Sequence, residues 1–358
     1  MLVGIKYERL RAISVKAVRF HEHGGPEVLK YEDAPDPVPT ADEVLVRVRA
    51  CALNHLDLWG RNGLPGVKIP LPHISGCDVA GVVEQVPEVE RTFSPGMEVI
   101  VNPNIACGRC EKCLLGRDDQ CRYFTILGYG VDGGYAELVK VPRTNVIPKP
   151  QGMSWTDAAS FPLVFLTAHH MLVVKAQVQA GETMLVLGAG SGVGVAAIQL
   201  AKLYNATVIA TASGEQKLRK AKELGADMVI DHSKQSILEE VRKMTGNRGV
   251  DIVVEHVGKA TWDSSIKSLA KGGRLVTCGA TSGAEVSTDL RYVYNREITV
   301  FGSFMGSKGE VLQVVELFKQ GKLKTVVDSI FPLEQASEAQ RRMENREHFG
   351  KIVLTVSS

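Results

Sequence analysis

The sequence predicts an α/β protein of two domains, a β-rich, barrel-like domain and a domain built on a doubly wound parallel sheet. From Val15 to about Pro150, short β-type runs are broken by Gly and Pro, which is typical of an all-β domain. After Trp155, apolar strands alternate with helices, and this alternation implies a parallel sheet. At roughly 100 to 200 residues per domain, the 358 residues of the chain also suit two domains rather than one.

The elements are expected in the following order. In the first half, strands are expected at residues 15–20, 43–53, 78–86, 97–103 and 133–141. In the second half, Ser236 and Glu239 form the pattern of a capping box, which opens a helix, and Gly225 ends another helix. Strands are expected there at 184–189, 206–211, 228–230, 249–258 and 272–280, with helices at 195–204, 217–224 and 262–269. A last helix at 311–319 and two strands at 326–333 and 350–356 are too few for a third domain, so they are expected to return to the first.

Composition excludes several classes of protein. Lys and Arg total 42 against 40 for Asp and Glu, and the resulting net charge of +2 disfavours a protein that binds nucleic acid. The longest apolar stretch contains His169 and His170, which are expected to be core or interface residues, and it is shorter than the about 20 residues of a membrane span. The first residues scatter charges where a signal peptide would be apolar. The sequence therefore predicts a cytoplasmic protein that does not bind membranes.

A glycine-rich turn follows the first strand of the second half and opens its first helix. In that setting glycines let the backbone approach a pyrophosphate, which then lies at the helix N-terminus. The glycines recur at every second residue from Gly188, which departs from the usual Gly-x-Gly-x-x-Gly spacing, and an ordinary tight turn is the alternative. The place of the turn in the chain favours a dinucleotide site, made of Gly190, Ser191, Gly192, Val193 and Gly194.

The end of the next strand bears on the choice of cofactor. Proteins that bind NAD place an acidic residue on the ribose hydroxyls about 20 residues beyond the glycines. This chain has Thr211-Ala-Ser213-Gly214 there, with Lys217 and Arg219 close behind. A hydroxyl flanked by cations suits a 2′-phosphate, so Ser213 and Lys217 favour NADP(H) over NAD(H). The alternative is that the cations only form the solvated face of a helix.

Four cysteines are concentrated in one loop, at residues 102–124. Their spacing, Cys107-x2-Cys110-x2-Cys113-x7-Cys121, offers four thiolates and suits one tetrahedral Zn²⁺ per chain. A [4Fe–4S] cluster is the rival, but the ferredoxin run has three residues before its last cysteine and Pro after it, where this chain has seven and then Arg122. Four cysteines leave no open position for substrate, so the zinc is expected to be structural, with nothing linking the loop to the nicotinamide.

Several segments in this order resemble the medium-chain dehydrogenase/reductase superfamily. The matching segments lie at residues 24–29, 52–57, 76–81, 132–137 and 189–194. The resemblance covers about residues 15 to 356. It implies a GroES-like β-rich catalytic domain over residues 1–164 and 303–358, a Rossmann coenzyme domain over residues 165–302, and a homo-oligomer, either a dimer or a tetramer.

The resemblance also implies where the zinc alcohol dehydrogenases of this superfamily would hold a catalytic metal. The ligand positions fall on Asn54, Cys77 and Leu163, and Asp78 takes the place of a neighbouring Glu. Asn and Leu supply no thiolate, so a catalytic zinc is not expected. The segment Asn54-x-x-Asp57 resembles the quinone oxidoreductase branch, whose members use NADPH and no catalytic metal. This chain differs from that branch because it keeps the four-cysteine loop.

These observations predict hydride transfer from NADPH to a small conjugated acceptor, a quinone or an enone. Catalytic zinc stabilises a developing alkoxide, whereas hydrogen bonds can suffice when conjugation spreads the incoming charge. Asn54 is expected to hydrogen-bond the substrate oxygen, although a turn-stabilising amide is the alternative. His55 is expected to donate a proton or to contact cofactor phosphate, and Asp57 to hold this segment in place.

Family position implies further cofactor contacts, each of which also suits an ordinary turn or sheet residue. They are Thr167, Val257, Gly258, Gly279, Ala280, Thr281, Phe301, Ser303 and Lys351. Two other functions stay open. One is a zinc-dependent alcohol dehydrogenase that acts on an alcohol/aldehyde pair, and the other is a non-enzymatic NADPH-binding protein.

Overall fold

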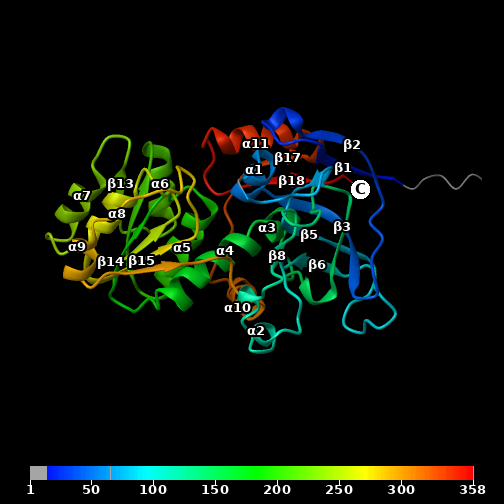
Figure 1. Cartoon of the computed structure of the whole chain (residues 1–358), viewed down its shortest axis with the longest axis horizontal. Helices are drawn as coiled ribbons and strands as arrows, with labels where there is room; N and C mark the ends of the chain where they lie inside the picture. The colour runs from blue at the N-terminus through cyan, green and yellow to red at the C-terminus, as the bar shows by residue number, and fades with distance from the viewer. Residues whose placement is uncertain (1–13, 65, 358) are drawn as a thin grey trace, which may run out of the picture.

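The computed structural model describes residues 14–64 and 66–357. It confirms the predicted fold class: two domains lie side by side along the long axis of the molecule, one rich in β-strands and one built on a parallel sheet (Figure 1). The exact division of the chain at residues 164 and 302 stays a prediction. In the described ranges no helix combines the length and the apolar character that crossing a bilayer requires.

The β-rich domain is built on a seven-stranded sheet in the order β10-β6-β5-β3-β18-β17, with β9 added to β3. The last strand of the chain, β18, pairs antiparallel with β3, so the C-terminus returns to the first half as the sequence predicts. The run at 133–141 becomes a strand only from Leu138, because the amides of residues 133–135 donate instead to the carbonyl oxygens of Ile74, Gly76 and Ser75. The strands of this sheet are β3 (Glu43–Ala52), β5 (Asp78–Gln85), β6 (Glu98–Val101), β9 (Leu138–Pro142), β10 (Val146–Pro148), β17 (Val327–Pro332) and β18 (Lys351–Thr355).

A smaller antiparallel sheet and several short helices complete this domain. The sheet has the order β2-β1-β4, with β1 (Ser14–Phe20), β2 (Lys30–Pro35) and β4 (His73–Ile74). The helices are α1 (His55–Asn62), α3 (Trp155–Ala159) and α11 (Ala336–Glu344), with single 3-10 turns η1 (Pro26–Val28), η3 (Arg143–Asn145) and η5 (Leu333–Gln335).

The second domain is a six-stranded parallel sheet in the order β13-β12-β11-β14-β15-β16. Its order reverses between β11 and β14, and ligands bind at such reversal points outside the carboxyl ends of the strands. The strands are β11 (Thr183–Val186), β12 (Thr207–Ala212), β13 (Met228–Asp231), β14 (Val250–Glu255), β15 (Leu269–Thr277) and β16 (Thr299–Gly302). The helices are α5 (Gly192–Leu203), α6 (Glu215–Glu223), α7 (Ile237–Met244), α8 (Trp262–Ser268) and α9 (Leu290–Asn295).

The two domains share one continuous hydrophobic cluster, which includes Ala50 of β3 and Val186 of β11. Helix α4 (Pro162–His169) is buried along its whole length and packs against α5 and α10 (Lys308–Lys319). It continues as a π-helical segment, η4 (His170–Lys175). The cysteine loop lies beside α10 and contains β7 (Asn104–Ile105), α2 (Glu111–Leu114), η2 (Asp118–Gln120) and β8 (Thr125–Ile126) (Figure 1).

Candidate functional site

The glycine-rich turn presents an open helix N-terminus at the reversal point of the sheet. The Ser191 hydroxyl caps α5 by accepting a hydrogen bond from the Gly194 amide at 2.9 Å. A Cβ at Gly194 would lie 2.3 Å from the carbonyl oxygen of Gly188, so this position requires glycine. Gly190, Gly192 and Val193 complete the turn into α5. The arrangement suits a pyrophosphate at the α5 N-terminus, where amide groups and the helix dipole favour an anion.

The two residues that are predicted to contact a 2′-phosphate, Ser213 and Lys217, differ in their surroundings. Ser213 is exposed in the turn after β12, and Gly214 follows it with φ of 81°. Lys217 is half-buried beside the glycine turn; burial lowers its pKa, and its Nζ donates a hydrogen bond to the carbonyl oxygen of Arg346. Arg219 is exposed on α6, as the solvated-face alternative expects.

An acidic residue that the sequence analysis missed also lies at this edge. Asp231 ends β13 directly opposite Ala212, the last residue of β12. Hydrogen bonds from the Ser233 hydroxyl and amide and from the Gly214 amide lower the pKa of its carboxyl group. The sequence contained a signal for this residue, because Asp231 directly follows the strand predicted at 228–230.

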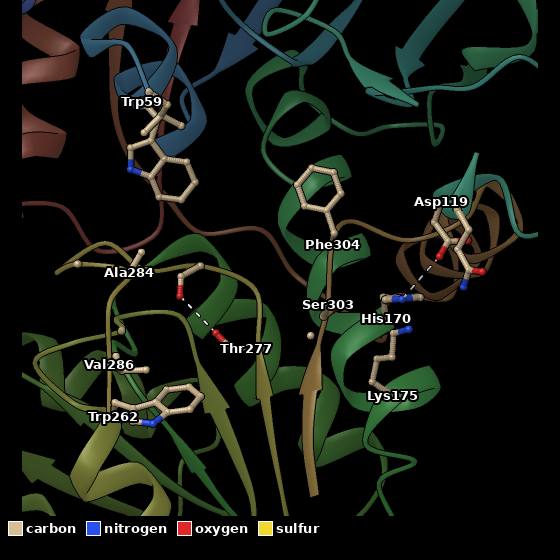
Figure 2. A pocket seen from close by; sticks show the side chains of 17 residues that line it. Trp59, Asp119, His170, Lys175, Trp262, Thr277, Ala284, Val286, Ser303 and Phe304 are labelled. Atoms are coloured by element: carbon tan, nitrogen blue, oxygen red, sulfur yellow. Dashed lines mark hydrogen bonds and ion pairs between the residues drawn. The ribbon is translucent and has the colours of Figure 1, made fainter. Parts of the chain in front are cut away.

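A cavity of about 780 Å³ lies at the carboxyl ends of β14, β15 and β16 (Figure 2). Trp59 of α1 faces it from the β-rich domain, and Trp262 and Phe304 supply aromatic walls from the other side (Figure 2). The sequence-predicted cofactor residues in its wall are Gly258, Gly279, Ala280 and Ser303. The predicted nicotinamide contacts and a space for a substrate therefore occur together.

The other residues that are predicted to contact the cofactor lie next to residues that line the cavity. Val257 and Phe301 directly precede Gly258 and Gly302, and the Thr281 amide donates to the carbonyl oxygen of His256 at 3.4 Å. Thr167 is buried on α4, with its hydroxyl 3.9 Å from the sulfur of Met305.

The residues at the implied catalytic-metal positions come together in space, as the resemblance implies, and Lys351 lies with them. They are Asn54, Cys77, Asp78 and Leu163. The Asn54 amide nitrogen lies 2.9 Å from Asp78 Oδ2 and 3.3 Å from the Cys77 sulfur. The Leu163 amide donates to Asp78 Oδ1 at 2.8 Å. Lys351 Nζ lies 2.6 Å from Asn54 Oδ1 and 3.0 Å from Asp78 Oδ2. Both ends of the Asn54 amide are thus bonded inside the protein, and a bond from Asn54 to a substrate requires an exchange of partners.

Asp57 holds the loop that carries Asn54. Its buried carboxylate accepts hydrogen bonds from the amides of Asn54 (2.7 Å) and Gly76 (3.1 Å) and from the Tyr135 hydroxyl (3.2 Å). Burial raises the pKa of Asp57 to about 6, even though these donors act to lower it. The contacts support the holding role expected for this residue.

His55 opens α1 beside several positively charged or titratable groups. Burial lowers its pKa to about 4, and His348, His256, Lys351 and Arg346 add to that effect. The ring is therefore neutral near pH 7. Because a bound anion would offset these neighbours, the surroundings suit the alternative role, contact with cofactor phosphate.

The four loop cysteines are arranged for one tetrahedral metal. Their sulfur atoms lie within 4.8 Å of one another, with pair distances of 3.5 Å for Cys110–Cys113 and Cys107–Cys121 and 3.8 Å for Cys110–Cys121. A Zn–S bond of about 2.3 Å places tetrahedral sulfurs about 3.8 Å apart, so the site fits zinc. Across residues 14–64 and 66–357, this is the one group of three or more Cys, His, Asp or Glu side chains with such spacing.

The cysteine loop reaches the cavity, which the sequence analysis did not expect. Asp119 and Gln120, just before Cys121, line the cavity wall. The preceding Asp118 carboxylate accepts hydrogen bonds from the Lys308 amide at the start of α10 (3.0 and 3.2 Å). The zinc loop therefore supports part of the cavity wall as well as the fold.

Comparisons with known proteins agree with this architecture. Residues 192–320 match the zinc-binding dehydrogenase family, and residues 40–151 match the alcohol dehydrogenase GroES-like domain. An NAD-dependent alcohol dehydrogenase of Sulfurisphaera tokodaii is 34% identical over 349 residues, 95% of this chain and 99% of that protein. The quinone oxidoreductase of Homo sapiens is 30% identical over 351 residues, 95% of this chain and 97% of that protein.

A solved structure extends the comparison. A crystal structure of an NAD-dependent alcohol dehydrogenase matches with a TM-score of 0.92 at 47% identity, covering 96% of this chain and 100% of that one. The resemblance read from the sequence is thereby confirmed. By name, these relatives favour the alcohol dehydrogenase alternative over quinone or enone reduction, because the alcohol dehydrogenases have the higher identities.

Substitution of one zinc ligand tests the double role of the loop. Cys110→Ser removes one of four thiolates, so we expect the melting temperature to fall by several degrees. Because Asp119 and Gln120 line the cavity, we also expect KM for the acceptor to rise while kcat of the folded fraction changes little. Arg109→Ser, an exposed side chain of the same loop, is the control and should change neither. Loss of kcat with unchanged melting temperature would contradict a structural zinc.

Proposed function

The chain belongs to the medium-chain dehydrogenase/reductase family of NAD(P)-dependent oxidoreductases, and on that premise we propose that it reduces a conjugated carbonyl acceptor, a quinone or an enone, without a catalytic metal. The family assignment and the four-cysteine zinc site narrow the function to nicotinamide-dependent redox chemistry on a small molecule. The acceptor class and the metal-free chemistry are the proposal.

One observation carries this proposal. At the positions where related alcohol dehydrogenases would hold a metal, the Lys351 ammonium is bonded to Asn54 and Asp78. The Lys351 side chain is 5% exposed and that of Asp78 is fully buried, so each charge has the other as its counter-ion. A metal ligated by Asp78 would have to break this pair and would leave a buried ammonium uncompensated, which is costly.

The chemistry follows from the charge that must be stabilised. The bound nicotinamide supplies a hydride. In a simple aldehyde the resulting negative charge stays on one oxygen, whereas a quinone or enone spreads it over a conjugated system, so fixed hydrogen-bond donors and a nearby ammonium can suffice. Asp57 holds the Asn54 segment, and Asn54 and Asp78 hold Lys351.

A second candidate function is a zinc-dependent alcohol dehydrogenase. The names of the NAD-dependent alcohol dehydrogenases with higher identity favour it. In that case Cys77 and Asp78 would contribute to a second metal site after Lys351 had moved away. The two functions differ in the number of zinc ions per chain and in the effect of chelation.

For the cofactor, we propose NADP(H) over NAD(H). Ser213, directly after β12, and the half-buried Lys217 of α6 support a 2′-phosphate. The names of the relatives and Asp231, at the end of the neighbouring strand, support NAD(H) instead. Direct comparison of the two cofactors decides between them.

Two expectations from the sequence stay predictions. A homo-oligomer, dimer or tetramer, and a cytoplasmic location rest on the resemblance and on the charges near the N-terminus, respectively. Size-exclusion chromatography with light scattering would measure the first.

Reversal of one charge tests the cofactor preference. Lys217→Glu should weaken NADPH binding by about tenfold or more, since a charge-assisted contact to phosphate contributes about 1.5 kcal/mol or more. NADH binding should change far less. Arg219→Glu, on the exposed face of the same helix, is the matched control. Equal affinity of the unmutated protein for NADPH and NADH, measured by fluorescence titration, would exclude the preference.

Mild chelation tests metal-free turnover. After treatment that leaves the four-cysteine site filled, we expect quinone or enone reduction to continue at the untreated rate, with negligible oxidation of a primary alcohol. The expectation follows from the Lys351–Asp78 pair, which leaves no loosely held metal to remove. Alcohol oxidation that disappears on chelation and returns with added zinc would support the second candidate function instead.

A further inference from the structure

His170 and Glu310 form a buried pair at the edge of the cavity. His170 Nδ1 lies 3.0 and 2.9 Å from the two carboxylate oxygens of Glu310. Glu310 is fixed in turn by Ser307, whose amide and hydroxyl donate to Oε1 at 3.1 and 3.0 Å in the capping box of α10. A helix cap therefore orients a carboxylate, and the carboxylate orients the imidazole, as in other sites where a third group positions a histidine.

This pair determines which ring nitrogen carries the exchangeable proton. Burial alone would raise the pKa of Glu310, but hydrogen bonds from His169, His170 and Ser307 lower it well below its usual range. An ionised carboxylate only accepts hydrogen bonds, so Nδ1 of His170 must carry a proton. Nε2 is then the atom that can exchange a proton with another group.

Nε2 is directed toward Asp119, which lines the same cavity. His170 lines the cavity together with Asp119 and Lys175, and its Nε2 is 4.0 Å from a carboxylate oxygen of Asp119 (Figure 2). The charged and titratable groups that face His170 are Glu310 of α10, Asp119 of η2, the adjacent His169 and, along the wall, Lys175. An imidazolium at this place has a carboxylate near each nitrogen.

The backbone brings His170 to the wall. Helix α4 ends at His169, and the wider π-helical segment η4 begins at His170 and ends at Lys175, so its first and last residues both line the cavity. π-helical turns are rare and are frequent at functional sites. His169 lies 3.5 Å from the same Glu310 but is not among the described residues of the wall.

We infer that His170 donates the proton that completes reduction, an inference that rests on the function proposed above. A reduced nicotinamide, when bound, would supply a hydride to the β-carbon of an enone, and the C=C electron pair would move toward the α-carbon and the carbonyl oxygen. The Nε2–H bond of His170 then breaks and its proton bonds to the α-carbon. The cofactor would be oxidised and the enone reduced, and the neutral ring would regain its proton from water.

The cavity supports this role better for His170 than for His55. The titratable side chains among the wall residues are Asp119, His170 and Lys175. His55 lies outside that wall, and its lowered pKa of about 4 leaves little of it protonated near neutral pH. In the same wall, Gly258, Gly279, Ala280 and Ser303 are the expected nicotinamide contacts, so His170 and these residues line one cavity.

A matched pair of variants tests the inference on the full-length protein. His170→Asn keeps an N–H near the position of Nδ1 for Glu310 and removes Nε2, and His169→Asn makes the same change one residue away. With NADPH and 2-cyclohexen-1-one, we expect kcat of His170→Asn to fall by about 10²- to 10⁴-fold, with KM for the enone and the NADPH affinity nearly unchanged. Any pH dependence of kcat that His170 contributes should disappear in this variant. His169→Asn removes only a partner of Glu310 at 3.5 Å, so it should lower kcat far less than His170→Asn does.

The outcomes separate this inference from the proposed function. If the wild type reduces neither 2-cyclohexen-1-one nor 1,4-benzoquinone, the proposed function and the inference both fail. If the wild type is active and His170→Asn keeps its kcat and pH profile, only the inference fails. Equal losses in both variants would show a structural role of the pair and would also overturn it. If His170→Asn does not fold, as judged by thermal melting, His170→Gln, whose amide cannot transfer a proton, takes its place with the same expectations.

Discussion

The Lys351 ammonium is buried, and a buried ammonium requires a counter-charge within hydrogen-bonding distance. Asp78 supplies that charge at 3.0 Å, and Asn54 supplies a second acceptor at 2.6 Å. Lys351 belongs to β18, Asp78 to β5 and Asn54 to the loop before α1. The pair therefore links the last strand of the chain to β5 within the seven-stranded sheet. Removal of one partner from such a pair costs about 3 to 5 kcal/mol. The same contact that secures the C-terminal strand therefore lies where the resemblance implies that related alcohol dehydrogenases hold a catalytic metal.

The zinc loop and the cavity are connected by a second series of contacts. Asp118 binds the start of α10, Glu310 in the first turn of α10 orients His170, and Asp119 faces His170 from the loop. A zinc ion in the cysteine loop can therefore influence the cavity through the position of α10. This connection relates a structural metal to substrate binding without giving it a role in hydride transfer.

The parts of the site that could be predicted from the sequence are those whose residues are close together in the chain. The four cysteines lie within one short segment, so their spacing alone indicated a metal site, whereas the glycine turn was interpreted from its place between a strand and a helix. The missing catalytic ligands at Asn54 and Leu163 were identified by the resemblance, residue by residue. The cavity was not predicted, because segments far apart in the chain assemble its wall.

The parts that could not be predicted depend on contacts between distant segments. Lys351 is 273 residues from Asp78 and 297 from Asn54, and His170 is 140 from Glu310, so no spacing rule pairs them. Lys351 was assigned to the cofactor alone, and His169 and His170 to the core or an interface. Their burial agrees with that assignment, but one π-helical segment places His170, and not its neighbour, in the described wall of the cavity.

The number of zinc ions bound per chain tests the central claim most directly. Native mass spectrometry of the purified protein should show one zinc per chain, unchanged in Cys77→Ser and lost in a variant with all four loop cysteines replaced. Two zinc ions per chain, with one lost in Cys77→Ser, would show that a metal displaces the Lys351–Asp78 pair and would contradict the account.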